Sequence, residues 1–332
     1  MRKIWWTWDI RTRWSHGFCY SAKSFVDNYT AMVDSARDFG VEGIVVWGFL
    51  RDRHGGVDAA KQLVDYAGER GVDIYPGVGI DDYGGVYYDG KSPYALDSYL
   101  REHPEARALR QDGTPDFHLW PPTDQTPRLK ACPSNERILA YYRESIDWLV
   151  DSFKLKGFQI EQGDSGLCWC PTCAKKPRVS SPDCAHADVT AASRRIPAVV
   201  DQLLKRRPDM TIITETYAGL TAESLRRMEA PLRSYQPQII ISWQVYDGNN
   251  NPERDTPTFK IDDGIKSPTP LGNAAIRTNN DLFLGEADER QNIRKALELS
   301  KQAGLTMTYL YGEYPSSWPV TRRNYECWAA NA

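Results

Sequence analysis

Strand-like and helix-like segments alternate along this chain, and that alternation constrains the fold most strongly. Apolar runs typical of buried strands lie at 4–9, 43–49, 72–78, 157–161, 210–215, 238–243, 271–277 and 305–311. Segments with apolar residues at helical spacing lie at 24–40, 57–70, within 93–110, and at 134–153, 189–206, 221–230 and 286–303. Three of these helical segments end in a glycine that leads directly into an apolar strand, at Gly40, Gly71 and Gly304. Eight strands alternating with helices predict an α/β fold, the (β/α)8 TIM barrel.

The same pattern predicts one barrel domain over 1–332, interrupted by two long insertions. Residues 79–133 follow the third strand and residues 162–188 follow the fourth. Because barrel active sites are built from the loops after the carboxyl ends of the strands, both insertions are expected to cover that face and shape a pocket. Segment 244–270 is rich in Asn, Asp and Pro and is predicted to be a long loop in place of a helix.

Composition excludes several classes of partner. The net charge is −3 and there is no long basic stripe, which argues against nucleic acid. No run approaches the ~20 apolar residues of a membrane span. The first residues reach Asp9 too early for a signal peptide, so a cytoplasmic location is expected, although a removed leader would leave no trace. The oligomeric state stays open, a homo-oligomer included.

The chain is rich in large amphipathic rings. Its 11 Trp and 18 Tyr exceed what a core needs, and both side chains have polar tips that suit half-exposed positions. Sugars present flat C–H faces on which such rings stack. Carbohydrate is therefore the expected substrate, with four indoles as candidates for sugar subsites: Trp47, Trp120, Trp243 and Trp318.

Charged and polar side chains gather where the predicted strands end. They are Asp9, Arg11, Arg51, Asp52, His54, Asp81, Asp82, Glu161, Asp164, Glu215, Asp247, Arg277, Asn279 and Glu313. So many acids on one face repel each other unless a ligand, arginines or protons offset them, which indicates a site. Substrate binding is assigned to Arg11, Glu215, Arg277 and Asn279, and an arginine favours a polar or acidic sugar. For any single acid, the alternative is a loop cap or a salt bridge.

The fourth strand carries the sharpest signal. It delivers Glu161 to the rim, and a Gly-rich turn brings Asp164 towards the same pocket. Cleavage of a glycosidic bond needs a protonated acid at the leaving oxygen and a carboxylate opposite. We interpret Glu161 or Asp164 as the general acid of an exo-acting glycosidase. The second carboxylate would come from Asp9, Asp247 or Glu313.

A cysteine-rich loop follows directly. Cys168, Cys170, Cys173 and Cys184 fall within 17 residues. This predicts a structural zinc site, with disulfides or free thiols as alternatives. Four protein ligands leave no open coordination position, so no catalytic cofactor is expected. The remaining cysteines, Cys19, Cys132 and Cys327, are predicted to be buried single thiols.

Residues 100–105, 132–135 and 161–173 resemble bacterial TIM-barrel glycoside hydrolases. They are most similar to relatives of the hexosaminidase and α-glucuronidase barrels, in which an acid-bearing fourth strand runs into a Cys-x-Cys-x-x-Cys loop. A similar cysteine spacing is found in zinc-containing β-galactosidases of the family 42 type. The resemblance implies an O-glycosyl hydrolase of carbohydrate metabolism. One departure is that the seventh strand ends in Arg277 and Asn279, where retaining enzymes of the large superfamily carry a nucleophilic Glu.

Three other hypotheses stay open. Asp9 and His118 are similar in arrangement to an inverting sialidase barrel family, in which arginines such as Arg11, Arg128 and Arg277 would hold a sugar carboxylate. A non-catalytic carbohydrate-binding barrel would use the same acids only to bind hydroxyls. A metal-dependent hydrolase would use His54, Asp81 and Asp82.

Overall fold

The computed structural model of the chain describes residues 2–8, 21–118, 128–161, 168–175, 189–215, 239–244, 246–247, 258–259, 272–277 and 307–312. Side chains are described at 4–7, 21–117, 128–161, 168–175 and 195–214. In the other described segments the backbone alone is considered.

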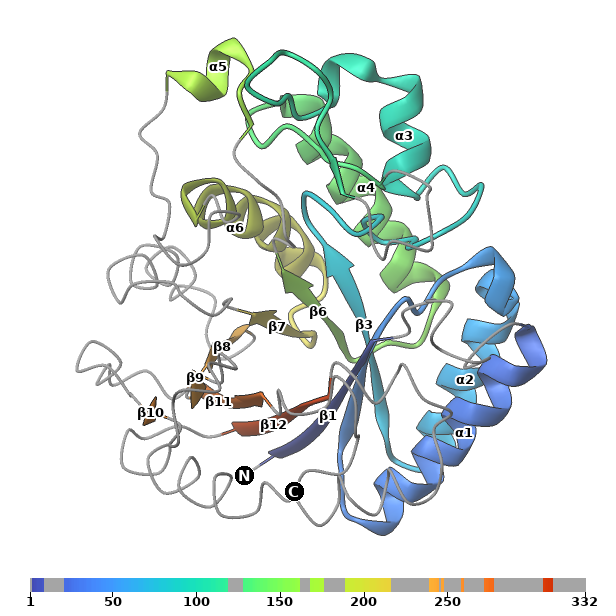
Figure 1. Cartoon of the computed structure of the whole chain (residues 1–332). Helices are drawn as coiled ribbons and strands as arrows, with labels where there is room; N and C mark the ends of the chain where they lie inside the picture. Colours follow the sequence, from blue (N-terminus) through green and yellow to red (C-terminus); the bar gives the residue numbers. More distant parts are fainter. Residues whose placement is uncertain are drawn as a thin grey trace.

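Eight parallel strands form a closed barrel (Figure 1). They are β1 (Arg2–Trp8), β2 (Gly43–Trp47), β3 (Asp73–Gly79), β6 (Gly157–Glu161), β7 (Thr211–Glu215), β8 (Ile239–Gln244), β11 (Gly272–Arg277) and β12 (Met307–Gly312). Each strand pairs in parallel with the strand before and after it among these eight, and β12 pairs with β1 to close the ring. All eight predicted strands are confirmed, each to within two residues at either end, and so is the (β/α)8 fold.

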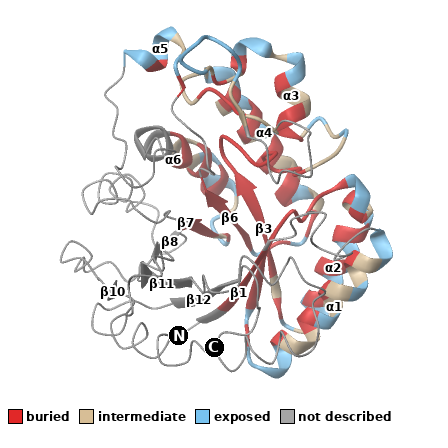
Figure 2. Ribbon diagram, in the orientation of Figure 1, coloured by how far each residue is buried: buried red, intermediate tan, exposed pale blue. Residues whose placement is uncertain are grey.

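The described helices that follow the strands also match the predicted segments. They are α1 (Ala22–Asp38), α2 (Gly56–Glu69), α4 (Glu136–Ser152) and α6 (Val189–Arg206). The hydroxyl of Ser21 caps α1 and the amide oxygen of Asn135 caps α4, each accepting from a backbone N–H of the first turn. Figure 2 shows the buried faces of α1 and α2 turned towards the strands. The predicted helices at 221–230 and 286–303 lie outside the described residues.

Both predicted insertions follow carboxyl ends of strands. The first, after β3, holds α3 (Leu96–Glu102), the short turn η2 (Pro104–Ala106) and a hairpin of β4 (Phe117–His118) and β5 (Arg128–Leu129). The second, after β6, holds α5 (Pro171–Ala174). The backbone N–H of Trp169 donates to the carbonyl of Leu109 (2.8 Å), so the two insertions lie side by side beyond the same end of the barrel (Figure 1).

Part of the segment at 244–270, predicted to be a long loop in place of a helix, is described. Two short strands in it, β9 (Tyr246–Asp247) and β10 (Thr258–Phe259), pair in antiparallel fashion. Between β2 and α2, one further short turn, η1 (Asp52–His54), connects strand to helix. Among the helices of the described segments, none is both long and apolar enough to cross a membrane.

Alternate side chains of β1, β2, β3 and β7 enter two different apolar clusters. On β2, Ile44 and Val46 pack outwards against the helices, whereas Val45 and Trp47 pack inside the barrel. The inner cluster also contains Ile4, Trp6, Tyr75, Tyr83, Tyr88 and Ile213. Because both faces of the sheet are covered, the strands are continuous apolar runs in the sequence.

Gly77 makes room for the largest ring of the inner cluster. A Cβ atom at this position would lie 2.4 Å from the indole of Trp47. We therefore expect Gly77→Ala to lower the free energy of unfolding by about 1–3 kcal/mol, measured by urea denaturation. Gly68→Ala is the control, because a Cβ on this residue of α2 meets nothing within 4 Å and is expected to stabilise by about 0.4–1 kcal/mol. Equal stability of Gly77→Ala and the unmodified chain would contradict this packing.

Candidate functional site

The end of β6 places one carboxylate on the inner face of the barrel. Gln159 contacts two indoles of the inner cluster, whereas Ile160 belongs to the outer cluster, so the two-residue period of a strand puts Glu161 inside with Gln159. Glu161 is only 4% exposed. Its neighbour across the ladder on β3 is Gly79, which has no side chain, and the backbone N–H of Ile80 donates to the Glu161 carbonyl (2.8 Å). Glu161 therefore occupies the carboxyl-terminal end of the barrel interior, as predicted.

An aromatic floor lies one layer below Glu161. The Oε1 atom of Gln159 accepts hydrogen bonds from Nε1 of Trp6 (2.7 Å) and Nε1 of Trp47 (2.6 Å). Between centroids, the Trp47 ring lies 6.4 Å from the Trp6 ring and 5.8 Å from the Tyr83 ring, with which it forms a T-shaped pair. Trp47 is 1% exposed, and its N–H donates to Gln159. This burial revises the predicted role of Trp47, which supports the site from below instead of presenting a face to a sugar.

The loop after β3 folds back tightly over the strand end. A Cβ on Gly79 would lie 2.2 Å from the carbonyl oxygen of Asp82, and a carboxylate oxygen of Asp82 accepts from the backbone N–H of Tyr83 (2.7 Å). Tyr83 has a φ of 54°, which is uncommon for a residue with a side chain and tends to persist at functional sites. The fold-back fixes the Tyr83 ring against Trp47.

Gln159 is expected to hold this floor in place. Gln159→Leu keeps the approximate volume but removes the acceptor, so the two buried indole N–H groups of Trp6 and Trp47 lose their shared partner. Because each unsatisfied buried donor costs about 1–3 kcal/mol, we expect the two together to lower the free energy of unfolding by about 2–6 kcal/mol. The change in indole environment is followed by near-ultraviolet circular dichroism. An unchanged spectrum together with unchanged stability would show that the shared acceptor contributes nothing.

Asp81 forms a buried ion pair instead of facing a ligand. Its carboxylate contacts the guanidinium of Arg195 on α6, and both side chains are less than 5% exposed. Arg195 Nη2 also donates to the carbonyl of Cys132 (2.8 Å). Burial lowers the pKa of Arg195 to about 9. Arg195 therefore ties together α6, the end of β3 and the segment that carries Cys132.

This arrangement does not support a metal-dependent hydrolase built on His54, Asp81 and Asp82. Asp81 is paired with Arg195, Asp82 binds the Tyr83 backbone, and the His54 ring stacks on Phe25 at a centroid distance of 5.2 Å. Among the described residues, the only metal-ligating side chains that converge in a group of three or more are cysteines.

Arg128 is engaged within the first insertion. It lies 3.2 Å from Asp97 and 3.4 Å from Asp89, and it donates to the carbonyl of Tyr88 (3.3 Å). Burial by itself lowers the pKa of Arg128, but the carboxylates of Asp89 and Asp97 outweigh it and raise that pKa above the ordinary value. The hypothesis that Arg128 holds a sugar carboxylate is therefore corrected, because its charge is already neutralised by two acids.

The predicted polar residues at the end of β2 also hold the first insertion. Asp52 accepts from the hydroxyl of Tyr87 (2.6 Å) and from the backbone N–H of Lys91 (2.9 Å), and burial raises the pKa of Tyr87. The guanidinium of Arg51 lies over the Tyr88 ring, 4.3 Å from its centroid. These contacts favour the salt-bridge and loop-cap alternative for this strand end.

The register places a second predicted acid beside Glu161. Ile160 pairs with Thr214, so the next residues, Glu161 and Glu215, stand at the same level on the adjacent strands β6 and β7. Glu215 in turn pairs with Ser242 of β8. Adjacent strands are ~4.8 Å apart, so the backbones of the two glutamates are close neighbours at the mouth of the barrel.

The other predicted site residues are located only in part. Four of them are described by their backbone alone: His118 in β4, Trp243 in β8, Asp247 in β9 and Arg277 at the end of β11. The remaining predicted site residues lie outside the described residues; they are Asp9, Arg11, Trp120, Asp164, Asn279, Glu313 and Trp318.

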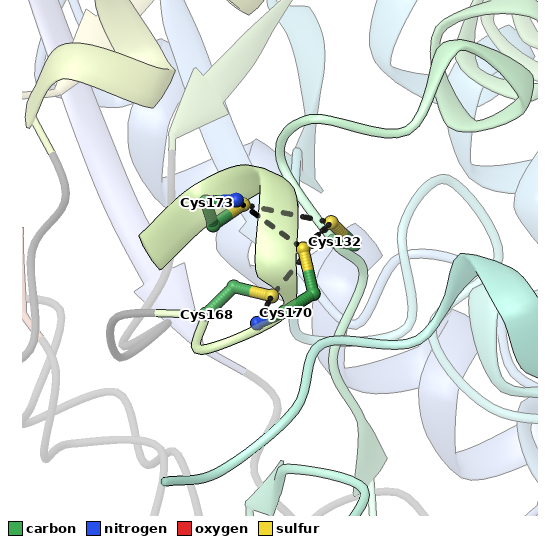
Figure 3. Close-up of side chains that lie close together, drawn as sticks. All are labelled: Cys132, Cys168, Cys170 and Cys173. Atoms are coloured by element: carbon green, nitrogen blue, oxygen red, sulfur yellow. Dashed lines mark hydrogen bonds between the residues drawn. The ribbon is translucent and has the colours of Figure 1, made fainter. Parts of the chain in front are cut away.

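The cysteines converge as predicted, but with a different fourth member. The sulfurs of Cys132, Cys168, Cys170 and Cys173 all lie within 4.8 Å of one another (Figure 3). The prediction that Cys132 is a buried single thiol is therefore wrong. Its position 36 residues before Cys168 hid this contact, because only the side-by-side packing of the two insertions brings them together. Cys184, the predicted fourth ligand, lies outside the described residues, as do Cys19 and Cys327.

Comparison with known proteins identifies no family. No protein-family profile matches the chain, and no curated protein matches it either. Similar solved structures include the GH36 α-galactosidase AgaB from Geobacillus stearothermophilus, with 12% identity, 99% of this chain and 40% of that chain covered, and a TM-score of 0.49. An α-amylase from Geobacillus thermoleovorans, complexed with acarbose, shows 11% identity over 99% of this chain and 77% of that chain, also with a TM-score of 0.49.

A third similar structure is the galactosidase domain of the α-galactosidase-sucrose kinase AgaSK, with 10% identity, 99% of this chain and 39% of that chain covered, and a TM-score of 0.47. The chain spans less than two thirds of the length of this structure and of AgaB. At these values the similarities carry no argument about activity.

Proposed function

We propose that this chain is a glycoside hydrolase whose active site lies at the carboxyl ends of β6 and β7. The observation that carries the proposal is the placement of Glu161, a carboxylic acid inside the mouth of a (β/α)8 barrel, above a floor of indole and phenol rings. Active sites of characterised TIM-barrel enzymes lie at this end. A carboxylic acid buried among apolar rings is favoured in its protonated form, and a protonated acid is what donation of a proton to a glycosidic oxygen requires.

In this proposal, Glu161 donates its proton to the leaving oxygen as the glycosidic bond breaks. A second carboxylate then either activates a water molecule, which gives inversion, or attacks the anomeric carbon, which gives retention. Asp9, Asp247 and Glu313 remain candidates for one of these roles, and Asp164 remains the alternative general acid. The register adds Glu215, which the sequence assigned to substrate binding, because it stands level with Glu161 on the next strand.

We further propose exo-action on a polar or acidic sugar. The two insertions follow β3 and β6 and pack against each other beyond the mouth of the barrel, which favours a closed pocket over an open cleft. Arg277 at the end of β11 is the candidate for a sugar carboxylate or hydroxyl. The sialidase-like alternative with Asp9 and His118 is tested by sialic acid conjugates among the substrates.

The test is a panel of aryl and natural glycosides that includes galactosides, glucosides, hexosaminides, uronides and sialic acid conjugates. Product formation is followed by chromatography, and binding is followed by calorimetry on the same panel. Turnover of at least one glycoside is expected, with the anomer of the first product, read by NMR, reporting inversion or retention. Sugar binding without turnover of any panel member would replace this proposal with the carbohydrate-binding barrel.

A further inference from the structure

We propose that Cys132, Cys168, Cys170 and Cys173 bind one Zn²⁺ ion that joins the two insertions. The proposal does not depend on the proposed function. It adds Cys132 as the fourth ligand in place of Cys184, and it gives the ion a structural role.

The spacing of the sulfurs fits a tetrahedral thiolate site. Cys132 Sγ lies 3.6 Å from Cys170 Sγ and 3.7 Å from the Sγ atoms of both Cys168 and Cys173. A tetrahedron of sulfurs around Zn²⁺, with Zn–S bonds of ~2.3 Å, has edges of about 3.8 Å. All four cysteines are free thiols, not disulfides. Figure 3 shows the side chains of Cys168, Cys170 and Cys173 turned towards Cys132.

Hydrogen bonds to the sulfurs fit thiolates better than thiols. The backbone N–H groups of Leu109 and Cys170 each point at Cys168 Sγ (3.5 Å), and that of Cys173 points at Cys170 Sγ (3.4 Å). Thiols are weak acceptors, whereas metal-bound thiolates are stabilised by such donors around the site.

The donor set selects the metal. Four thiolates in tetrahedral geometry are the ligands of structural zinc and, less commonly, of iron, whereas Ca²⁺ and Mg²⁺ require oxygen ligands. Four sulfurs also fill the coordination shell, so no position is left for water or substrate. The ion is therefore expected to act on structure and not on the chemical step.

The site connects three parts of the molecule. Cys132 closes the first insertion, where its backbone N–H donates to the Ala106 carbonyl (2.8 Å). The other three cysteines lie in α5 or just before it in the second insertion. The Cys132 carbonyl in turn accepts from Arg195, which pairs with Asp81 at the end of β3. A metal ion at this point would hold both insertions in place relative to the barrel.

The first test measures metal content of the full chain, purified under reducing conditions without chelator, by inductively coupled plasma mass spectrometry. One zinc per chain is expected. Cys132→Ser and Cys170→Ser should each lose it, and the matched control Cys184→Ser should keep it. Zinc lost from Cys184→Ser and kept in Cys132→Ser would overturn the ligand assignment. Stoichiometric iron, or no bound metal after incubation with Zn²⁺, would overturn the zinc site.

The unmodified chain supplies a second test if the serine variants do not fold. Exchange of the bound ion for Co²⁺ should produce the intense visible bands of tetrahedral cobalt together with sulfur-to-cobalt charge transfer. A weak spectrum of six-coordinate cobalt would contradict the site.

Hydrogen exchange tests the joining role. Metal removal should speed exchange at the amides of Leu109, Trp169 and Cys173 by about tenfold or more, while β2 and β3 stay protected, because local opening does not require the barrel to unfold. Unchanged hydrogen exchange in 103–118 and 168–175 after complete metal removal would show that the ion does not hold the two insertions together.

Discussion

Arg195→Met is expected to lower the free energy of unfolding by about 3–5 kcal/mol in urea denaturation. The substitution keeps an apolar stem of similar length but removes the charge that Asp81 contacts, and Asp81 is 1% exposed. An uncompensated carboxylate would then remain in the interior, and the Cys132 carbonyl would lose its donor. Since small domains are stable by only ~5–15 kcal/mol, this loss is a large fraction of the total.

Two comparisons isolate the buried charge as the cause. The double variant Arg195→Met/Asp81→Asn removes both charges and should recover a substantial part of the loss, which a double-mutant cycle measures. Arg206→Met is the matched control on the same helix, because Arg206 pairs with Asp147 and Asp151 at the surface and is 43% exposed. Its loss should stay below ~1 kcal/mol. Equal losses for the two arginine variants would mean that burial of the Asp81 pair is energetically irrelevant.

The barrel could be predicted from the sequence because its physical cause is local. A strand covered on both faces needs apolar residues at every position, and such runs are visible without knowledge of their neighbours. The sequence therefore predicted a strand at 43–49, where β2 lies, and a strand that ends at Glu161, as β6 does. The eightfold alternation then left few alternatives to a closed barrel.

The site could be predicted only where position along a strand decides the outcome. Glu161 was placed correctly at the end of its strand, because the end of an apolar run determines the level of its last residue. By contrast, nothing near Asp81 in sequence distinguishes it from a ligand-binding acid, since its partner Arg195 is 114 residues away. Cys132 was missed for the same reason, and the burial of Trp47 depends on the absent side chain of Gly77 on the neighbouring strand.

Glu161→Gln is expected to reduce kcat on a natural glycoside by about 10²–10⁴-fold, because the amide cannot donate the proton that general acid catalysis contributes. The substitution is nearly isosteric, so the pairing of β6 with β3 and β7 should be kept, as circular dichroism and thermal melting will check. If Glu161 acts only in the transition state, KM should change little while kcat and kcat/KM fall together.

The leaving group separates the roles that Glu161 could take. An aryl glycoside with an acidic phenol leaves without protonation, so Glu161→Gln should lose much less rate on it than on an alkyl or natural glycoside if Glu161 is the acid. A nucleophilic Glu161 would instead make both substrates fail equally. Glu215→Gln is measured on the same two substrates, because Glu215 stands level with Glu161 on the next strand. Full turnover of both substrate classes by Glu161→Gln would remove Glu161 from catalysis and shift the search to the other carboxylates at the barrel mouth.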